Sequence, residues 1–161
     1  MTDAPATPLP FGRSGWPGKK ALMQSKDISQ VLYTEGQIAR RVAELGAAIT
    51  ADYAGEPAEQ GIVVVSVLRG AAIFMADLCR QIGLPLEMDY MAVSSYGNGT
   101  ESSGMVRILK DVTADLEGKH VIIAEDILDS GLTLERLIDE LASRGPASIE
   151  VATLLRKRRQ G

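Results

Sequence analysis

Hydrophobic side chains recur at helical spacing in three stretches of the chain. The first spans residues 34–53, where Thr34 and Gln37 resemble a capping box and apolar residues follow every three or four positions. The second spans residues 71–82. The third forms an i, i+3, i+4, i+7 stripe of Leu134, Leu137, Ile138 and Leu141. Each pattern predicts a helix with one buried face.

Shorter apolar runs separate these helices. Residues 62–68 form a continuous, largely β-branched run, which is typical of a strand buried on both faces. Strands are also predicted over 28–33, 86–93, 106–109, 121–124 and 149–155. Strands that alternate with helices form parallel sheets. We therefore expect an α/β fold, a mostly parallel twisted sheet flanked by helices.

The chain of 161 residues has the length of one domain. We expect a flexible leader at 1–28, rich in proline and glycine, and one domain at 29–161. The hydrophobic content of 45% excludes disorder of the whole chain. No apolar run approaches the roughly 20 residues that span a bilayer, and the N-terminus lacks the apolar core of a secretory signal. A cytoplasmic protein without a membrane partner is predicted.

Charged and metal-binding residues narrow the range of functions. Seventeen basic and 21 acidic side chains give a net charge of −4, which argues against general nucleic-acid binding. Cys79 is the only cysteine and His120 the only histidine, so an internal disulfide and a multi-cysteine zinc site are excluded. A bound metal would need oxygen ligands, and this chemistry suits Mg²⁺.

One segment joins an apolar strand, several acids and a helix start. It reads VIIAEDILDSGLT over residues 121–133, at the carboxyl end of a strand, where α/β sheets bind ligands. Backbone N–H groups and hydroxyls of Ser130, Gly131 and Thr133 at a helix N-terminus favour a phosphate. Glu125 and Asp126 suit hydroxyl groups and a hydrated Mg²⁺ ion. A phosphorylated sugar satisfies the whole arrangement.

A plainer interpretation of this segment is also open. The same residues form a strand, an acidic turn and a helix capped by Asp129 or Ser130, without any ligand. The paired acids directly after an apolar strand, followed by the complete Ser-Gly-x-Thr sequence, favour the binding site.

The segment EDILDSGLT at 125–133 resembles the phosphoribosyl-pyrophosphate motif of type I phosphoribosyltransferases, and more narrowly that of bacterial hypoxanthine (guanine) phosphoribosyltransferases. Three further segments agree in order and spacing. VLRGA at 67–71 resembles the pyrophosphate loop of this family, residues 94–104 resemble its mobile catalytic loop, and LLRK at 154–157 resembles the strand with the purine-reading lysine. The resemblance covers about residues 25–159.

The resemblance implies a role for each matching residue. Asp129 is the expected catalytic proton acceptor near purine N7, and Lys157 the expected donor to the purine O6. Glu125 and Asp126 are the expected ligands of Mg²⁺, and the peptide between Leu68 and Arg69 is expected to be cis in some states. Two groups of residues are expected to bind the rest of the substrate. The phosphoribosyl group is expected to contact Glu125 and Asp126 as well as Ser130, Gly131, Leu132 and Thr133, and pyrophosphate is expected to contact Arg69, Gly70, Ser95 and Tyr96.

The implied activity is Mg²⁺-dependent transfer of phosphoribose from phosphoribosyl pyrophosphate to N9 of hypoxanthine or guanine, which yields IMP or GMP and pyrophosphate in purine salvage. The implied assembly is a homodimer or homotetramer. Family members continue past the strand near Leu155, so we expect a truncated domain with an incomplete purine-binding hood. Two alternatives stay open: a nucleotide-sensing or RNA-binding regulatory module with 156–159 as a basic patch, and an inactive truncated copy.

Overall fold

The computed structural model describes residues 29–95, 106–129 and 131–157. The chain divides into two units, residues 1–34 and 35–161. In the first unit, residues 29–34 form neither helix nor strand, so the strand predicted over 28–33 is wrong in its described part. A strand must hydrogen-bond to a neighbouring strand, and a local pattern of apolar residues cannot supply that neighbour. The predicted leader at 1–28 lies outside the described residues.

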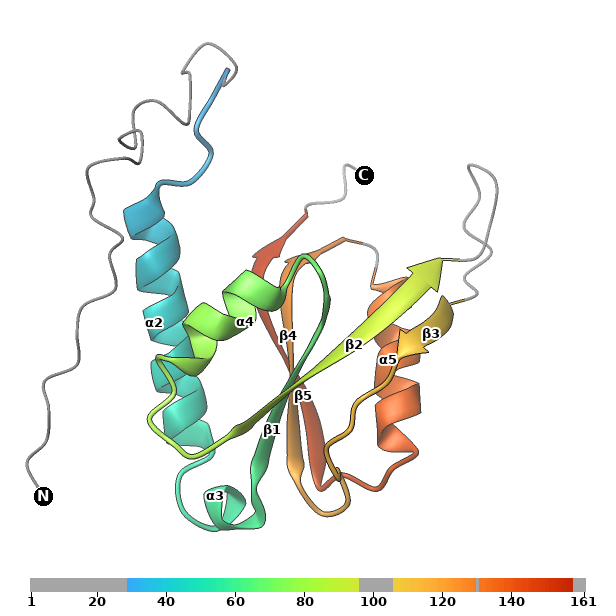
Figure 1. Ribbon diagram of the computed structural model, residues 1–161. Coiled ribbons are helices and arrows are strands. Elements are labelled where there is room, and N and C mark those ends of the chain that lie inside the picture. Colours follow the sequence, from blue (N-terminus) through green and yellow to red (C-terminus); the bar gives the residue numbers. More distant parts are fainter. Residues whose placement is uncertain (1–28, 96–105, 130, 158–161) are drawn as a thin grey trace, which may run out of the picture. The chain divides into compact units, whose positions relative to one another are not determined.

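The second unit is built on a five-stranded sheet with the order β3-β2-β1-β4-β5 (Figure 1). Only the β2–β3 pair is antiparallel among the described strands, which confirms the mostly parallel sheet. The strands are β1 (Ile62–Leu68), β2 (Glu87–Ser95), β3 (Val106–Lys110), β4 (His120–Leu128) and β5 (Ser148–Arg156).

Helices cover both faces of the sheet. Helices α2 and α4 lie on one side and α5 on the other, while the short α3 follows α2 near the start of β1 (Figure 1). The helices are α2 (Glu35–Asp52), α3 (Glu56–Gln60), α4 (Ala72–Cys79) and α5 (Leu132–Ala142). No helix among the described residues is long and apolar enough to cross a membrane.

The apolar run of β1 is explained by two separate core clusters. Val64 belongs to the cluster under α2 and α4, whereas Val63 and Val65 belong to the cluster under α5. Successive side chains of a strand point to opposite faces, so a strand that is covered on both faces must be apolar at almost every position. The main partners are Phe74, Met75, Leu78 and Ile122 in the first cluster and Met91, Ile123, Leu137 and Leu141 in the second.

The largest differences from the sequence prediction concern α4, α3 and β4. Helix α4 ends at Cys79 rather than near 82, because the chain turns at Gln81, whose N–H donates to the Leu78 carbonyl oxygen at 2.8 Å. Gln81 packs directly against Gly46 of α2, where no side chain would fit. Helix α3 was not predicted, although Pro57 in its first turn is a residue that helices accept there. Strand β4 continues four residues beyond Ala124, through the predicted acidic turn.

A buried carboxylate ties β2 to the segment after β3. Asp89 is 6% exposed, and its Oδ2 accepts hydrogen bonds from the backbone N–H groups of Thr113 at 2.5 Å and Ala114 at 2.9 Å. Its Oδ1 accepts from the Lys110 ammonium at 3.2 Å. Burial by itself raises the pKa of Asp89, but the backbone donors of Ala114, Tyr90 and Thr113 and the Lys110 ammonium outweigh it and hold this pKa well below its usual range.

Candidate functional site

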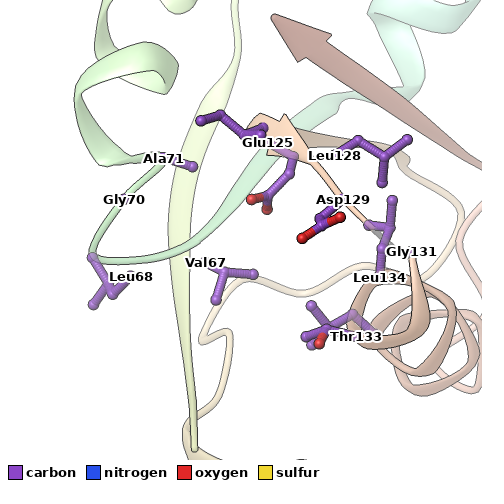
Figure 2. Close-up of a pocket in the computed structure, with 12 residues that line it drawn as sticks. Val67, Leu68, Gly70, Ala71, Glu125, Leu128, Asp129, Gly131, Thr133 and Leu134 are labelled. Atoms are coloured by element: carbon purple, nitrogen blue, oxygen red, sulfur yellow. The ribbon is translucent and has the colours of Figure 1, made fainter. Parts of the chain in front are cut away.

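A pocket of about 290 Å³ lies at the carboxyl ends of β1 and β4. Two regions far apart in sequence line it: the end of β1 with Gly70 and Ala71, and the stretch that runs from the end of β4 into the start of α5. Figure 2 shows the carboxylates of Glu125 and Asp129 directed into the space between the Leu68–Ala71 loop and Thr133. Sheets of this kind bind ligands at this edge, so the pocket is the candidate site.

The longer β4 determines how the acids are held. Parallel pairing with β5 continues to the end of β4, with Glu125 opposite Thr153 and Leu128 opposite Arg156. Glu125 and Asp126 therefore belong to a paired strand rather than to a loop. This pairing fixes their backbone, and alternation along the strand sends their side chains in different directions. Glu125 lines the pocket, whereas Asp126 does not.

The pKa of Glu125 is raised by its surroundings. Burial, the negative charge of Asp126 and a hydrogen bond with the Asp126 side chain together raise the pKa of Glu125 to about 7. Asp126 also accepts a hydrogen bond from the Ile127 N–H at 3.0 Å. No group of three or more potential metal ligands gathers anywhere in the described residues. Two carboxylates fit Mg²⁺, because this ion keeps several waters and completes its shell with substrate phosphates.

The start of α5 faces the pocket with a glycine and a threonine. Gly131 precedes the helix with a φ of 83°, a left-handed conformation that favours glycine, and Glu135 N–H donates to its carbonyl oxygen at 2.9 Å. No side chain caps this helix among the described residues. Gly131 and Thr133 both line the pocket, so the positive end of the helix dipole and a hydroxyl face an anion there.

The loop between β1 and α4 forms the opposite wall. The peptide between Leu68 and Arg69 is cis, as the family resemblance implied. Gly70 lines the pocket and lies against Asp126, since a Cβ on Gly70 would be 3.3 Å from the Asp126 Oδ2. This contact joins the predicted pyrophosphate loop to a predicted Mg²⁺ ligand.

Lys157 meets Asp129 at the mouth of the pocket. The Lys157 Nζ lies 3.0 Å from the Asp129 Oδ2, and the Lys157 backbone N–H donates to the Leu128 carbonyl oxygen at 2.9 Å. The Asp129 carboxylate is thus paired with the predicted purine-reading lysine. Because Gly131 occupies the cap position without a side-chain hydrogen bond, the described residues do not support Asp129 as a helix cap.

The structure brings together part of the predicted residue set. Gly70, Glu125, Asp129, Gly131 and Thr133 line the pocket, and Lys157 joins them through Asp129. Three predicted residues, Arg69, Asp126 and Leu132, do not line it. Ser130, Tyr96 and the side chain of Ser95 lie outside the described residues, and the Ser95 backbone ends β2 rather than belonging to a loop.

Sequence reasoning missed the apolar part of the pocket wall. Ile127 is 51% exposed and lines the pocket between Glu125 and Asp129, a large apolar surface beside two carboxylates. Its position in the sequence could have indicated this role, because Ile127 lies only three residues after the apolar strand that was predicted to end at Ala124. The other apolar lining residues are Val67, Leu68, Ala71, Leu128, Leu134 and Leu137.

Comparison with known protein families gives one match over most of the chain. Residues 30–161 match the family model described as the phosphoribosyl transferase domain. The hypoxanthine-guanine phosphoribosyltransferase of Mycobacterium avium is 50% identical over 143 residues, which cover 88% of this chain and 70% of that protein. The hypoxanthine phosphoribosyltransferase of Haemophilus influenzae is 50% identical over 127 residues, which cover 79% of this chain and 70% of that protein.

Comparison with solved structures gives proteins of the same kind as the sequence relatives. The crystal structure of a hypoxanthine phosphoribosyltransferase from Staphylococcus aureus superposes with a TM-score of 0.76 at 46% sequence identity. The match covers 82% of this chain and 70% of the Staphylococcus aureus chain. The likeness therefore extends from the sequence motifs to the arrangement of the sheet and helices.

Proposed function

We propose, on the premise that this chain belongs to the phosphoribosyltransferase family, that it transfers phosphoribose from phosphoribosyl pyrophosphate to hypoxanthine or guanine in purine salvage. The observation that carries the proposal is one pocket lined by Gly70, Glu125, Asp129 and Thr133, in a chain half identical to enzymes named for this activity. These relatives are named transferases, and a sensing or RNA-binding module is not favoured.

We assign the two phosphate groups of the substrate to the two walls of the pocket. The α5 start, with Gly131 and Thr133, takes the sugar phosphate, and the Gly70 loop takes the pyrophosphate. These roles are supported by the absence of a side-chain cap on α5 among the described residues and by Gly70 and Gly131 on the two walls, where phosphate oxygens can approach the backbone. Arg69, Ser95, Tyr96, Ser130 and Leu132 keep their predicted binding roles as part of the proposal.

Asp129 and Lys157 are proposed to act on the purine. The base loses a proton when N9 forms its bond to the ribose, and Asp129 accepts a proton at the neighbouring N7 side. Lys157 donates to the O6 of the purine, which favours 6-oxopurines over adenine. Their 3.0 Å separation supports this proposal, because two groups that read adjacent edges of one ring must lie close together.

Magnesium is proposed as the cofactor, with Glu125 and Asp126 as its protein ligands or as partners of its water shell. When bound, Mg²⁺ would offset the charge of the pyrophosphate leaving group. The proximity of the two carboxyls supports this assignment, because their mutual repulsion is relieved by a cation.

A direct assay tests the proposal. The chain is mixed with phosphoribosyl pyrophosphate, MgCl₂ and hypoxanthine, guanine or xanthine, and both the nucleotide and the released pyrophosphate are quantified. We expect product with hypoxanthine or guanine and none without Mg²⁺. A folded chain that releases no pyrophosphate with any of the three bases would overturn the proposed activity. Light scattering checks the proposed homodimer or homotetramer, and the cytoplasmic location stays a prediction.

A further inference from the structure

Ser66 lies in the middle of the sheet with an unused hydroxyl group. The residue belongs to β1 and has no exposed surface, and its Oγ has no hydrogen-bond partner among the described residues. Buried hydroxyls normally have a partner, because an unpaired one loses its hydration without compensation. Such a group therefore calls for a structural or functional explanation.

The position of Ser66 connects it to the pyrophosphate loop. Side chains alternate along β1, so Ser66 shares the sheet face of Val64, which packs in the core cluster under α4. Ala124 of β4 is its neighbour in register, one residue before Glu125. Leu68, where the loop to α4 begins, is two residues further along the same strand. The hydroxyl thus lies on the α4 side of the sheet, close in sequence to the loop.

The start of α4 has no side-chain cap among the described residues. Ala71, whose side chain cannot cap a helix, occupies the N-cap position and is 1% exposed. The nearest turn hydrogen bond, from Ala72 N–H to the Arg69 carbonyl oxygen, is long at 3.4 Å. The first N–H groups of any helix need partners from outside the helix. An unpartnered hydroxyl in β1 and a helix start without a side-chain cap therefore flank the same loop.

We propose that Ser66 is a positioning residue for the pyrophosphate loop, and that its Oγ accepts a hydrogen bond from a loop or α4 N–H when the loop closes on pyrophosphate. This inference rests on the proposed function. Ser66 does not touch the substrate in this proposal. Its hydroxyl holds the backbone of the loop when pyrophosphate is bound.

Calorimetry with magnesium pyrophosphate, on the whole chain, tests the proposal together with thermal unfolding of the ligand-free protein. In Ser66→Ala the ligand-free protein loses an unpaired polar group, so its Tm should rise by about 2–4 °C. The loaded loop loses its acceptor, so affinity for pyrophosphate should fall by about threefold to thirtyfold. Stability and affinity are therefore expected to change in opposite directions.

Two further variants separate this role from simple packing. Ser66→Cys keeps a side chain of similar size but a poor acceptor, so it should lose affinity like Ser66→Ala. Ser148→Ala is the matched control, because the Ser148 hydroxyl is already paired, at 2.8 Å from the His120 Nδ1, at the opposite end of the sheet. This control should lower the Tm and leave pyrophosphate affinity unchanged.

The possible outcomes distinguish this role from the proposed function. If the unaltered chain binds magnesium pyrophosphate and Ser66→Ala binds it within twofold, the role of Ser66 is refuted while the proposed function stands. If the folded, unaltered chain does not bind magnesium pyrophosphate at all, the loaded state does not exist and both proposals fall. A lower Tm of Ser66→Ala, with affinity unchanged, would mark Ser66 as an ordinary core residue.

Discussion

Lys157 and Asp129 form an ion pair across the mouth of the pocket, with 3.0 Å between the Lys157 Nζ and the Asp129 Oδ2. Twenty-eight residues separate them in sequence. Both side chains are 66% exposed, so the pair contributes little to stability. A purine that binds to both groups has to take the place of this direct contact, which makes the pair a sensitive point for substitution.

Removal of the Asp129 charge should affect turnover more than binding. Asn keeps the shape and much of the hydrogen-bonding capacity of Asp, but it cannot accept the proton. We expect Asp129→Asn to lower kcat by about 10²–10⁴ with little change in KM for phosphoribosyl pyrophosphate. Steady-state kinetics with hypoxanthine measure both constants. An unchanged kcat would remove Asp129 from the proposed proton transfer.

Replacement of Lys157 should weaken binding of the purine base and leave binding of pyrophosphate unchanged. Lys157→Met keeps most of the side-chain length and loses the ammonium donor. We expect KM for hypoxanthine to rise by about tenfold to a hundredfold, while binding of magnesium pyrophosphate stays the same. The Tm should change by no more than about 2 °C, because an exposed pair contributes less than about 1 kcal/mol. A large fall in Tm would show that Lys157 has a structural role instead.

Thr133 should show the opposite behaviour to Asp129. Its hydroxyl is proposed to contact a charged phosphate oxygen in both the ground state and the transition state, and such hydrogen bonds contribute about 1.5–3 kcal/mol. Thr133→Ala should therefore weaken binding of phosphoribosyl pyrophosphate by roughly tenfold to a hundredfold and leave kcat nearly unchanged. Calorimetry and kinetics on the same preparation check this. Thr133→Ser, which keeps the hydroxyl, should retain most of the affinity.

A substitution at Gly70 tests the contact between the β1–α4 loop and Asp126. An added Cβ would lie 3.3 Å from the Asp126 Oδ2, so the carboxylate or the loop has to shift by a few tenths of an ångström. We expect Gly70→Ala to raise KM for phosphoribosyl pyrophosphate by about threefold to tenfold, with a matching increase in the Mg²⁺ concentration needed for half-maximal rate.

Gly36→Ala is the matched control for this substitution. Gly36 lies in α2 with open space around its Cα, and the change should raise the free energy of unfolding by up to about 1 kcal/mol without altering KM. If both variants raise KM equally, the effect of Gly70→Ala does not come from the contact with Asp126.

The lowered pKa of Asp89 should make the free energy of unfolding depend on pH in the acidic range. Because its pKa is lowered by folding, the carboxylate stabilises the fold above its unfolded pKa near 4, and this stabilisation is lost as the pH falls toward the folded pKa. The free energy of unfolding should therefore decrease from about pH 5 downward. Asp89→Asn should lower this free energy by about 2–4 kcal/mol at pH 7 and make its pH dependence shallower. Urea unfolding at a series of pH values measures both effects. Equal slopes in the two proteins would exclude Asp89 as the main titrating group.

Local pattern was sufficient for most of the fold. The helical spacing in 34–53 and the β-branched run of 62–68 predicted α2 and β1 almost residue for residue. In both cases the burial of one helix face or of both strand faces imposes a period that can be read directly from the chain. The same reading placed the strand at 28–33 wrongly and ended β4 too early, because strand pairing depends on a neighbour that the local pattern does not contain.

The motif at 125–133 was sufficient to predict which part of the chain contributes to the pocket, because phosphates and Mg²⁺ select a small set of residue types. The sequence by itself thus determined the α/β class and the candidate acids, glycine and threonine. Only the tertiary structure decided that Glu125 lines the pocket while Asp126 lies against Gly70. It also decided that Lys157 meets Asp129 and that Ile127 forms part of the wall. The physical reason is that the parallel pairings of β4 with β5 and with β1 set these distances, and both depend on contacts between residues far apart in the chain.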